Sequence, residues 1–147
     1  MAGVFIDISG NAFPRLQELA SRAEDMQTAL DEIGAFLDLD VSERFKEEQA
    51  PDGSKWEQSE AARLGHSKGK KRLGLTLTDL RGLAGSVTHK VEGNVLIHGL
   101  GEEYAAIHHF GGKTGRNHSV TLPSRKILGI APVQEKEINN IIADWLV

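Results

Sequence analysis

Histidines and carboxylates gather in one short stretch of the chain, where they could bind a metal ion or transfer a proton. The stretch 104–112 reads YAAIHHFGG, and His108 and His109 are adjacent within it. A zinc hydrolase needs about three protein ligands and a general base. The candidates for these roles are His98, Glu102, Glu103, His108, His109 and His118. Residue types alone therefore make a metal-dependent hydrolase one function to consider.

The spacing of these residues argues against a metal or catalytic centre. On a helix, adjacent side chains point about 100 degrees apart, so His108 and His109 cannot hold one ion on one face. Neither HExxH nor its inverse occurs, and Glu102 and Glu103 stand six and five residues before His108 rather than four. The chain also has no GxSxG and no Walker A motif. We therefore predict no catalytic residue, no metal and no cofactor, and a protein that is not an enzyme.

The same stretch has an architectural interpretation. Tyr104, Ile107 and His108 are spaced i, i+3 and i+4, which predicts one face of a short helix packed on a sheet. The glycines at 111–112 should end this helix. His109 should then cap or hydrogen-bond the glycine turn, so both histidines would serve the fold rather than a reaction.

Apolar periodicity predicts the elements that would position this stretch. The first half should contain a strand at 4–8, a helix of about three turns from Pro14, and the longest helix, from Asp25 to a turn at 50–53. The second half should contain a hairpin of 86–91 and 94–97 joined at Glu92-Gly93, a short helix within 102–110, a strand at 119–122 and a helix from Pro132. Together they predict one α+β domain over 1–147, with a small, mainly antiparallel sheet packed against two or three helices.

A basic segment separates the two halves of the domain. We predict a long, mobile basic loop over 59–83, because loops of more than about 15 residues in compact domains are usually functional or disordered. Its candidate interaction residues are Lys68, Lys70, Lys71, Arg72 and Arg81. A nucleic-acid-binding protein acting through 63–81 is the alternative function. No aromatic residues for base stacking are interleaved with these charges, so direct DNA binding is the less favoured alternative.

Charge and composition limit the partners and the compartment. Residues 1–60 carry a net charge of −9 and residues 61–147 a net charge of +5. This asymmetry indicates either a solvated acidic helix face or head-to-tail packing of like subunits. The absence of cysteine excludes thiolate chemistry and fits a reducing compartment. No window approaches the roughly 20 apolar residues that span a bilayer, so we expect no membrane segment.

Five segments in a fixed order carry a resemblance to a known family. Four of them read RFKEEQAPDGSKW (44–56), LTLTDLRGLAGSV (75–87), VLIHGLGEEYAAIHHFGG (95–112) and SVTLPSRKILGI (119–130), and the C-terminal helix follows. This order resembles the phage virion morphogenesis family, the tail-completion proteins of Mu-like and P2-like tailed phages and prophages. The chain departs from the family at 122–129, where LPSRKILG replaces the usual IPARPFLG and so loses the second proline and the aromatic residue.

The resemblance implies a structural role without catalysis, in which the protein completes the phage tail or joins it to the head. It implies an α+β fold, a homo-oligomeric ring that is commonly a hexamer, and contacts with tail-tube or head–tail neck proteins. It also implies assembly in the cytoplasm of a bacterial host, and it leaves open whether the protein stays in the tail of the finished virion. His108, His109 and Arg125 are the candidates for assembly contacts or for holding the segment that makes them. For Arg125, the alternative is an ion pair with Glu102 or Glu103.

Overall fold

The fold is α+β, as predicted. The computed structural model describes residues 12–64, 66–67, 70–71, 75–77 and 82–147. Its helices are α1 (Ala12–Glu24), α2 (Gln27–Glu47), α3 (Glu60–Leu64), α4 (Ala105–Phe110) and α5 (Pro132–Leu146), and two short 3-10 turns, η1 (Ala84–Ser86) and η2 (Arg116–His118), accompany them. The strands are β1 (His66–Ser67), β2 (Lys70–Lys71), β3 (Val87–Glu92), β4 (Val95–Leu100), β5 (Gly112–Thr114) and β6 (Val120–Leu122).

The strands form separate antiparallel pairs rather than the single small sheet that we predicted. Within the described residues, β1 pairs with β2, β3 with β4, and β5 with β6. The β3–β4 hairpin has the predicted turn, in which Gly93 adopts a φ of 59°. The predicted strand at 119–122 is β6, and its partner β5 was not predicted. An isolated two-stranded pair is marginal in water, so each pair depends on the helices beside it.

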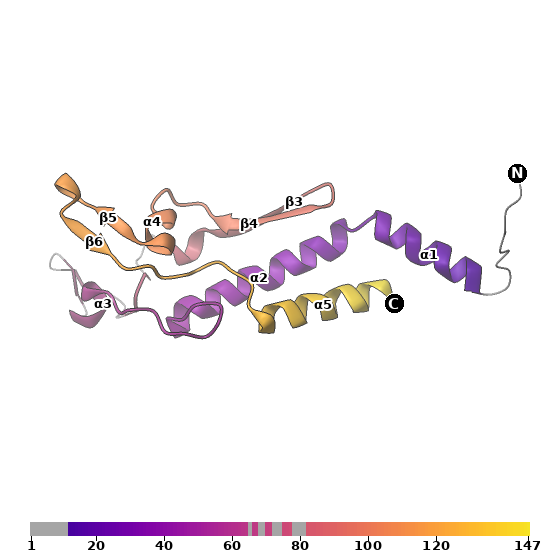
Figure 1. Ribbon diagram of the computed structural model, residues 1–147, viewed down its shortest axis with the longest axis horizontal. Coiled ribbons are helices and arrows are strands. Elements are labelled where there is room, and N and C mark those ends of the chain that lie inside the picture. The colour runs from indigo at the N-terminus through magenta and orange to yellow at the C-terminus, as the bar shows by residue number, and fades with distance from the viewer. Residues whose placement is uncertain (1–11, 65, 68–69, 72–74, 78–81) are drawn as a thin grey trace, which may run out of the picture.

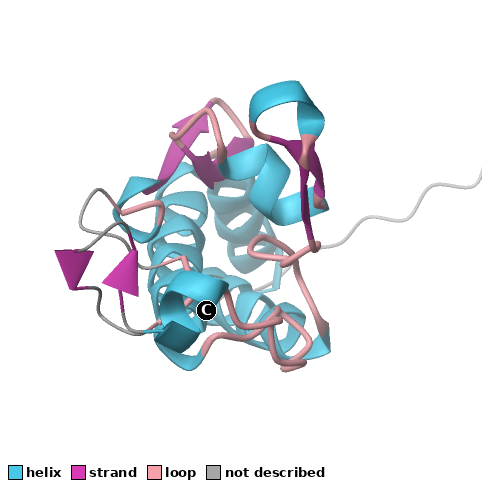
Figure 2. Ribbon diagram, turned by 90° about the vertical axis from the view of Figure 1, so that its left-hand side faces the viewer, coloured by secondary structure: helices cyan, strands magenta, loops and turns pink. Residues whose placement is uncertain are grey.

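The molecule is elongated, with α2 as its axis (Figure 1). The β3–β4 hairpin lies along one side of α2 and α5 along another, and both contact it. Figure 2, a view along the long axis, shows the helices gathered with the strand pairs around them. At one end α1 extends past the other labelled elements, and at the other end lie α3, α4 and the β5–β6 pair. Among the described residues, more elements therefore gather at the second end than at the first.

The core lies along one face of α2, the longest helix as predicted. Its apolar residues at intervals of four, Ile33, Leu37, Val41 and Phe45, are all buried. Toward the α3 and α4 end, the core continues through buried Ala50, Trp56, Leu83 and Ile127. Phe45 and Trp56 meet edge to face, with ring centroids 5.4 Å apart. Trp56 therefore folds back onto the core from the turn at 50–53.

The segment 59–83 is not one continuous loop, in contrast to our prediction. It contains α3 and the β1–β2 pair, and Ala62, Thr76 and Leu83 within it are buried. The amide of Thr76 donates to Glu48 Oε1 at 2.6 Å, which ties the segment to the end of α2. The predicted strand at 4–8 and the candidate residues Lys68, Arg72 and Arg81 lie outside the described residues. Lys70 and Lys71 form β2, but their side chains are not described.

Candidate assembly site

Three of the predicted site residues meet along one segment without regular secondary structure. This segment, 123–131, connects β6 to α5 and crosses the middle of the molecule (Figure 1), and it is here termed the strap. Its residue Ile127 is completely buried. A buried segment without helix or strand partners must have its backbone polar groups satisfied by other parts of the chain. The residues that satisfy them define the candidate site.

Arg44 of α2 is the central anchor of the strap. Its Nη1 donates to the carbonyl oxygen of Ile127 at 2.6 Å and its Nη2 to that of Gly129 at 3.1 Å. The same guanidinium forms an ion pair with Asp40, one turn earlier on α2. Arg44 is only 3% exposed. Burial lowers the pKa of its guanidinium, and the charge of Asp40 opposes that shift. A buried charge needs such partners in place of water, and here the two carbonyl oxygens and Asp40 provide them.

His109 of α4 binds the strap from the opposite direction. Its Nδ1 accepts hydrogen bonds from the amides of Ile127 at 3.1 Å and Leu128 at 3.4 Å. A ring nitrogen that accepts must be unprotonated, so this geometry requires neutral His109 with its hydrogen on Nε2. Burial and the nearby charge of Lys126 lower the pKa of His109 in agreement with that requirement. Our prediction that His109 caps the 111–112 turn was therefore wrong, because its acceptor faces the strap.

Two further side chains fasten the strap, one near its middle and one at its end. Trp56 Nε1 donates to the carbonyl oxygen of Lys126 at 2.9 Å. Gln134 Oε1 accepts from the amide of Ala131 at 2.9 Å, while its Nε2 donates to the carbonyl oxygen of Pro51 at 3.2 Å. Gln134 is buried and lies in the first turn of α5. The strap is thus tied to α2, to the turn that follows it and to α5.

The end of α4 approaches the strap so closely that a glycine is required. A Cβ on Gly111 would lie 2.7 Å from the amide nitrogen of Ser124 and 2.9 Å from the carbonyl oxygen of Leu122, and its φ is 74°. The amide of Arg125 donates to the carbonyl oxygen of His108 at 2.9 Å. The predicted stop of α4 at Gly111 is confirmed, and the close approach explains it better than helix propensity alone.

Arg125 and His108 lie on the other side of the strap, beside an open groove. The groove has a volume of about 560 Å³ and is lined by residues of α3, α4 and β6. Arg125 is buried, and its Nε donates to the carbonyl oxygen of Glu57 at 2.6 Å. In the part of the chain that the structure describes, its partner is therefore Glu57 and not Glu102 or Glu103. Burial lowers the pKa of Arg125, and the charge of Glu57 opposes the shift.

His108 shares the groove with Arg125, and its buried Nδ1 has no hydrogen-bond partner among the residues that the structure describes. Its ring meets Tyr104 edge to face, with centroids 6.0 Å apart, so the predicted helix face of these two residues is confirmed. Burial, then the charge of Arg125, lowers the pKa of His108. Because His109 faces the strap and His108 faces the groove, the adjacent histidines diverge as helix geometry requires.

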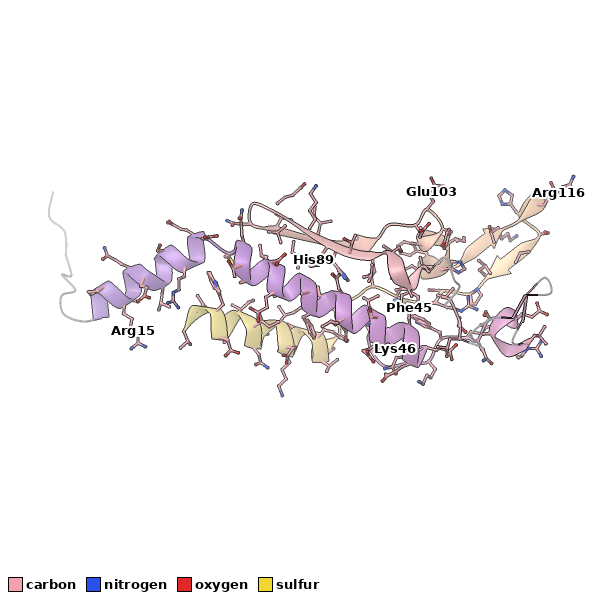
Figure 3. All side chains as sticks on the ribbon, turned by 180° about the vertical axis from the view of Figure 1, so that it is seen from behind. Arg15, Phe45, Lys46, His89, Glu103 and Arg116 are labelled. Atoms are coloured by element: carbon pink, nitrogen blue, oxygen red, sulfur yellow. The ribbon has the colours of Figure 1, made fainter. Side chains whose placement is uncertain are left out.

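A second histidine cluster was missed by our sequence reasoning. His89 and His98 face each other in the register of the β3–β4 hairpin and lie over α2. His89 Nδ1 is 2.6 Å from Asp38 Oδ2, and its Nε2 is 3.1 Å from Asp31 Oδ1. His98 Nε2 is 3.1 Å from Asp38 Oδ1. Asp38 therefore ties β3 to the helix through His89, which Figure 3 labels. The approach of Asp38 to His98 on β4 lacks hydrogen-bond geometry, and both atoms have no other hydrogen-bond partner among the described residues.

The two histidines of this cluster respond differently to their surroundings. Hydrogen bonds to Asp38 and Asp31 raise the pKa of His89. Burial lowers the pKa of His98 against the opposing charge of Asp38. The signal that could have found the cluster is strand alternation, since Val87, His89 and Val91 share one face of β3. Neither interpretation of the acidic charges, a solvated helix face or packing between subunits, pairs Asp38 with a histidine of the same chain.

The hydrogen bonds described above hold chain segments in position. Within the described residues, no group of three or more histidine, aspartate or glutamate side chains could hold a metal ion. None of the helices that the structure describes is long and apolar enough to cross a membrane. The backbone polar groups of the strap bond to side chains of Arg44, Trp56, His109 and Gln134, so these side chains position chain segments.

Comparison with known proteins gives two matches. The model of a family described as the phage virion morphogenesis family matches residues 11–147. A relative, Mu-like prophage FluMu G protein 2 from Haemophilus influenzae, is 42% identical over 76 residues. That alignment covers 52% of this chain and 55% of the relative, so the chain spans about half the length of the curated relative it matches. No solved structure is significantly similar to the chain.

Proposed function

The chain belongs to the phage virion morphogenesis family, and from this premise we propose that it completes the phage tail or joins the tail to the head. The observation that carries the proposal is the family match, because it includes every described element from α1 to α5. A role in phage assembly follows from the family, and tail completion is the step within assembly that we propose. Its partners would be tail-tube or head–tail neck proteins.

The internal bonding of the strap supports a structural role. Arg44, Trp56 and His109 all use their polar atoms on strap backbone groups. A protein that works by presenting a surface needs such rigid internal connections, because a loosely held segment would have to be ordered on binding. His108 and Arg125, the candidates that line the open groove, are the ones placed to act on a partner.

The distribution of charge supports assembly as a ring. An acidic groove of about 250 Å³ lies between the end of α2 and the first turn of α5. The carboxylates that line it are Asp40, Glu43, Glu47 and Asp52. Residues 61–147 carry a net positive charge, and the basic segment 59–83 contains five of the candidate interaction residues. In the proposed ring, the acidic groove of one subunit faces the basic segment of the next.

Particle morphology tests the proposed step. A phage or inducible prophage that lacks this gene should produce unjoined heads and tails, or tails of abnormal length, in electron micrographs. Supplying the intact chain from a plasmid should restore joined particles. Normal infectious particles in the absence of the gene would overturn the proposal.

Salt dependence tests the ring. The double variant Lys70→Glu, Lys71→Glu should self-associate more weakly than the intact protein in sedimentation experiments. Raised salt should weaken the self-association of the intact protein in the same way, because salt screens the charges. Lys90→Glu is the matched control, because Lys90 lies on the exposed outer face of β3. An intact chain that stays monomeric at every concentration and at low salt would exclude the ring.

A further inference from the structure

Three residues of α2 form a slot that holds the ring of His89. These residues, Asp31, Gly34 and Asp38, follow one another at intervals of three and four positions, so they share one face of the helix. A Cβ added at Gly34 would lie 2.3 Å from Cδ2 of His89, so the ring rests directly against the helix backbone. Because His89 belongs to β3, the slot joins the β3–β4 hairpin to α2.

Both ring nitrogens of His89 face carboxylate oxygens in this slot. Nδ1 lies 2.6 Å from Asp38 Oδ2, one turn after Gly34, and Nε2 lies 3.1 Å from Asp31 Oδ1, one turn before it. An ionised carboxylate only accepts hydrogen bonds, and a neutral imidazole has only one N–H to donate. The doubly protonated ring is the form that donates to both carboxylates. The slot is therefore shaped for an imidazolium cation.

His98 has no such arrangement. It is the register partner of His89 in β4, and its Nε2 lies 3.1 Å from Asp38 Oδ1 without hydrogen-bond geometry. Burial lowers the pKa of His98, and the charges of His89 and Arg44 add to this shift against the opposing charge of Asp38. Among the described residues, the charged groups of α2 that act on the two rings are Asp31, Asp38 and Arg44. The hairpin thus offers one ring that favours the proton and one that does not.

The hairpin is attached to the rest of the chain in two different ways. At its base, Val87 and Leu100 are opposite each other and pack against the buried core. The outer half of the hairpin, residues 90–97, contains no buried residue. Because little apolar surface is removed from water there, the outer half has weaker apolar attachment than the base. The contact of His89 with the slot lies between these two parts, at the point where core packing ends.

We propose that the slot holds the outer half of the hairpin on α2 while His89 is protonated, and releases it when His89 loses its proton. After the loss, one ring nitrogen still donates, but the lone pair of the other faces a carboxylate oxygen and the contact becomes unfavourable. The base of the hairpin stays in the core, so the release is a local opening. The inference goes beyond the proposed function, because every contact that it uses lies within one chain.

The release should follow rising pH. Hydrogen bonds to Asp38 and Asp31 raise the pKa of His89 above its ordinary value near 6.5. The attachment is therefore complete below about 6.5 and is lost as the pH rises through the pKa of the folded protein. The side chain of His89 is 18% exposed, so its proton exchanges with water without unfolding of the chain.

Amide hydrogen exchange at pH values from 6 to 8.5 tests the release. After correction for intrinsic exchange rates, the amides of the outer half should be several-fold less protected than those of Ile127 and Leu128 in the strap. Their protection should fall several-fold further as the pH rises. In His89→Gln this pH dependence should disappear, and in the matched control Lys90→Gln, on the exposed face of β3, it should remain.

Two results of this experiment would overturn the proposal. Protection of the outer half that does not change with pH would show that the proton on His89 does not hold the hairpin. Outer-half amides that exchange only as slowly as the strap amides would show that the hairpin opens only when the whole chain unfolds.

Chemical rescue with imidazole provides a second readout. His89→Ala empties the slot, and added imidazole should restore protection of the outer half because it fills the space between the hairpin and α2. The rescue should be several-fold stronger at pH 6, where imidazole is mostly a cation, than at pH 8.5. Val91→Ala is the matched control, since Val91 shares the inward face of β3 with His89 and should not be rescued. Absent rescue, equal rescue of both variants, or rescue that strengthens with pH would contradict the proposal.

Discussion

The strap is irregular but contains buried residues, whereas α1 is a regular helix with exposed side chains. The strap has no helix or strand, yet Arg125 and Ile127 within it are buried. The helix α1 is regular over 13 residues, yet none of its described side chains is buried. The strap is fixed by partners from α2, α4 and α5, whereas α1 is held at its last turn. In this molecule, a segment is therefore fixed by its tertiary contacts and not by being a helix or a strand.

Two arginines make the same contrast at the level of single residues. Arg44 donates to two strap carbonyls and pairs with Asp40 in a buried setting. Arg22 also approaches a backbone carbonyl and pairs with Glu18, but its side chain is 39% exposed. Water has more access to the bonds of Arg22 than to those of Arg44, whose side chain is only 4% exposed. The comparison predicts that the same substitution will have very different effects at the two positions.

The largest effect is expected from Arg44→Ala. It should lower the free energy of unfolding by about 3 kcal/mol or more, because removal of one partner leaves buried polar groups unpaired. Arg22→Ala should cost less than about 1 kcal/mol. Urea unfolding with an unchanged m value measures both. Similar losses for the two variants would show that the strap is no better fixed than α1.

The second effect concerns the hairpin that lies on α2. Gly34→Ala would favour the helix by about 1 kcal/mol at an open position. Here the added Cβ would overlap the imidazole ring of His89, so we expect a net destabilisation of about 1–3 kcal/mol. In a His89→Ala background the same change should become neutral or stabilising. A double-mutant cycle measures this coupling, and additive effects would exclude the proposed close contact.

The third effect is a pH dependence that differs between the strap and the hairpin. The pKa of His109 is lowered in the folded protein, so its contribution to stability is present above its ordinary pKa near 6.5 and is lost as pH falls toward the folded value. The pKa of His89 is raised, so its contribution is present below about 6.5 and is lost as pH rises through the folded value.

Single variants separate these two contributions. His109→Gln should reduce the loss of stability on the acid side, and His89→Gln should reduce the loss on the alkaline side. Unfolding free energies measured from pH 5 to 9 check both. His108 and His98 also have lowered pKa values, so they too reduce stability as the pH falls. Each single variant should therefore keep part of the acid sensitivity of the intact protein. A change on the same side of the profile for both variants would contradict the assignments.

Local patterns predicted the elements, and long-range contacts determined the site. The stripe of α2, the turn at Gly93 and the start of α5 at Pro132 each depend on neighbouring residues, and all three were predicted. The strap anchors are far apart in sequence: Trp56 precedes its partner by 70 residues, and Arg44 precedes its two partners by 83 and 85. No periodicity encodes such pairings, so neither the role of Arg44 nor the acceptor role of His109 could be derived.

The smallest effect is expected from Leu16→Ala. Its side chain is more than half exposed, and alanine favours the helix slightly more than leucine. The change in unfolding free energy should therefore be within about 0.5 kcal/mol. Ile127→Ala in the strap should cost about 2–5 kcal/mol, because Ile127 is completely buried within the core. Urea unfolding measures both variants, and a loss for Leu16→Ala close to that for Ile127→Ala would remove the difference between the two regions.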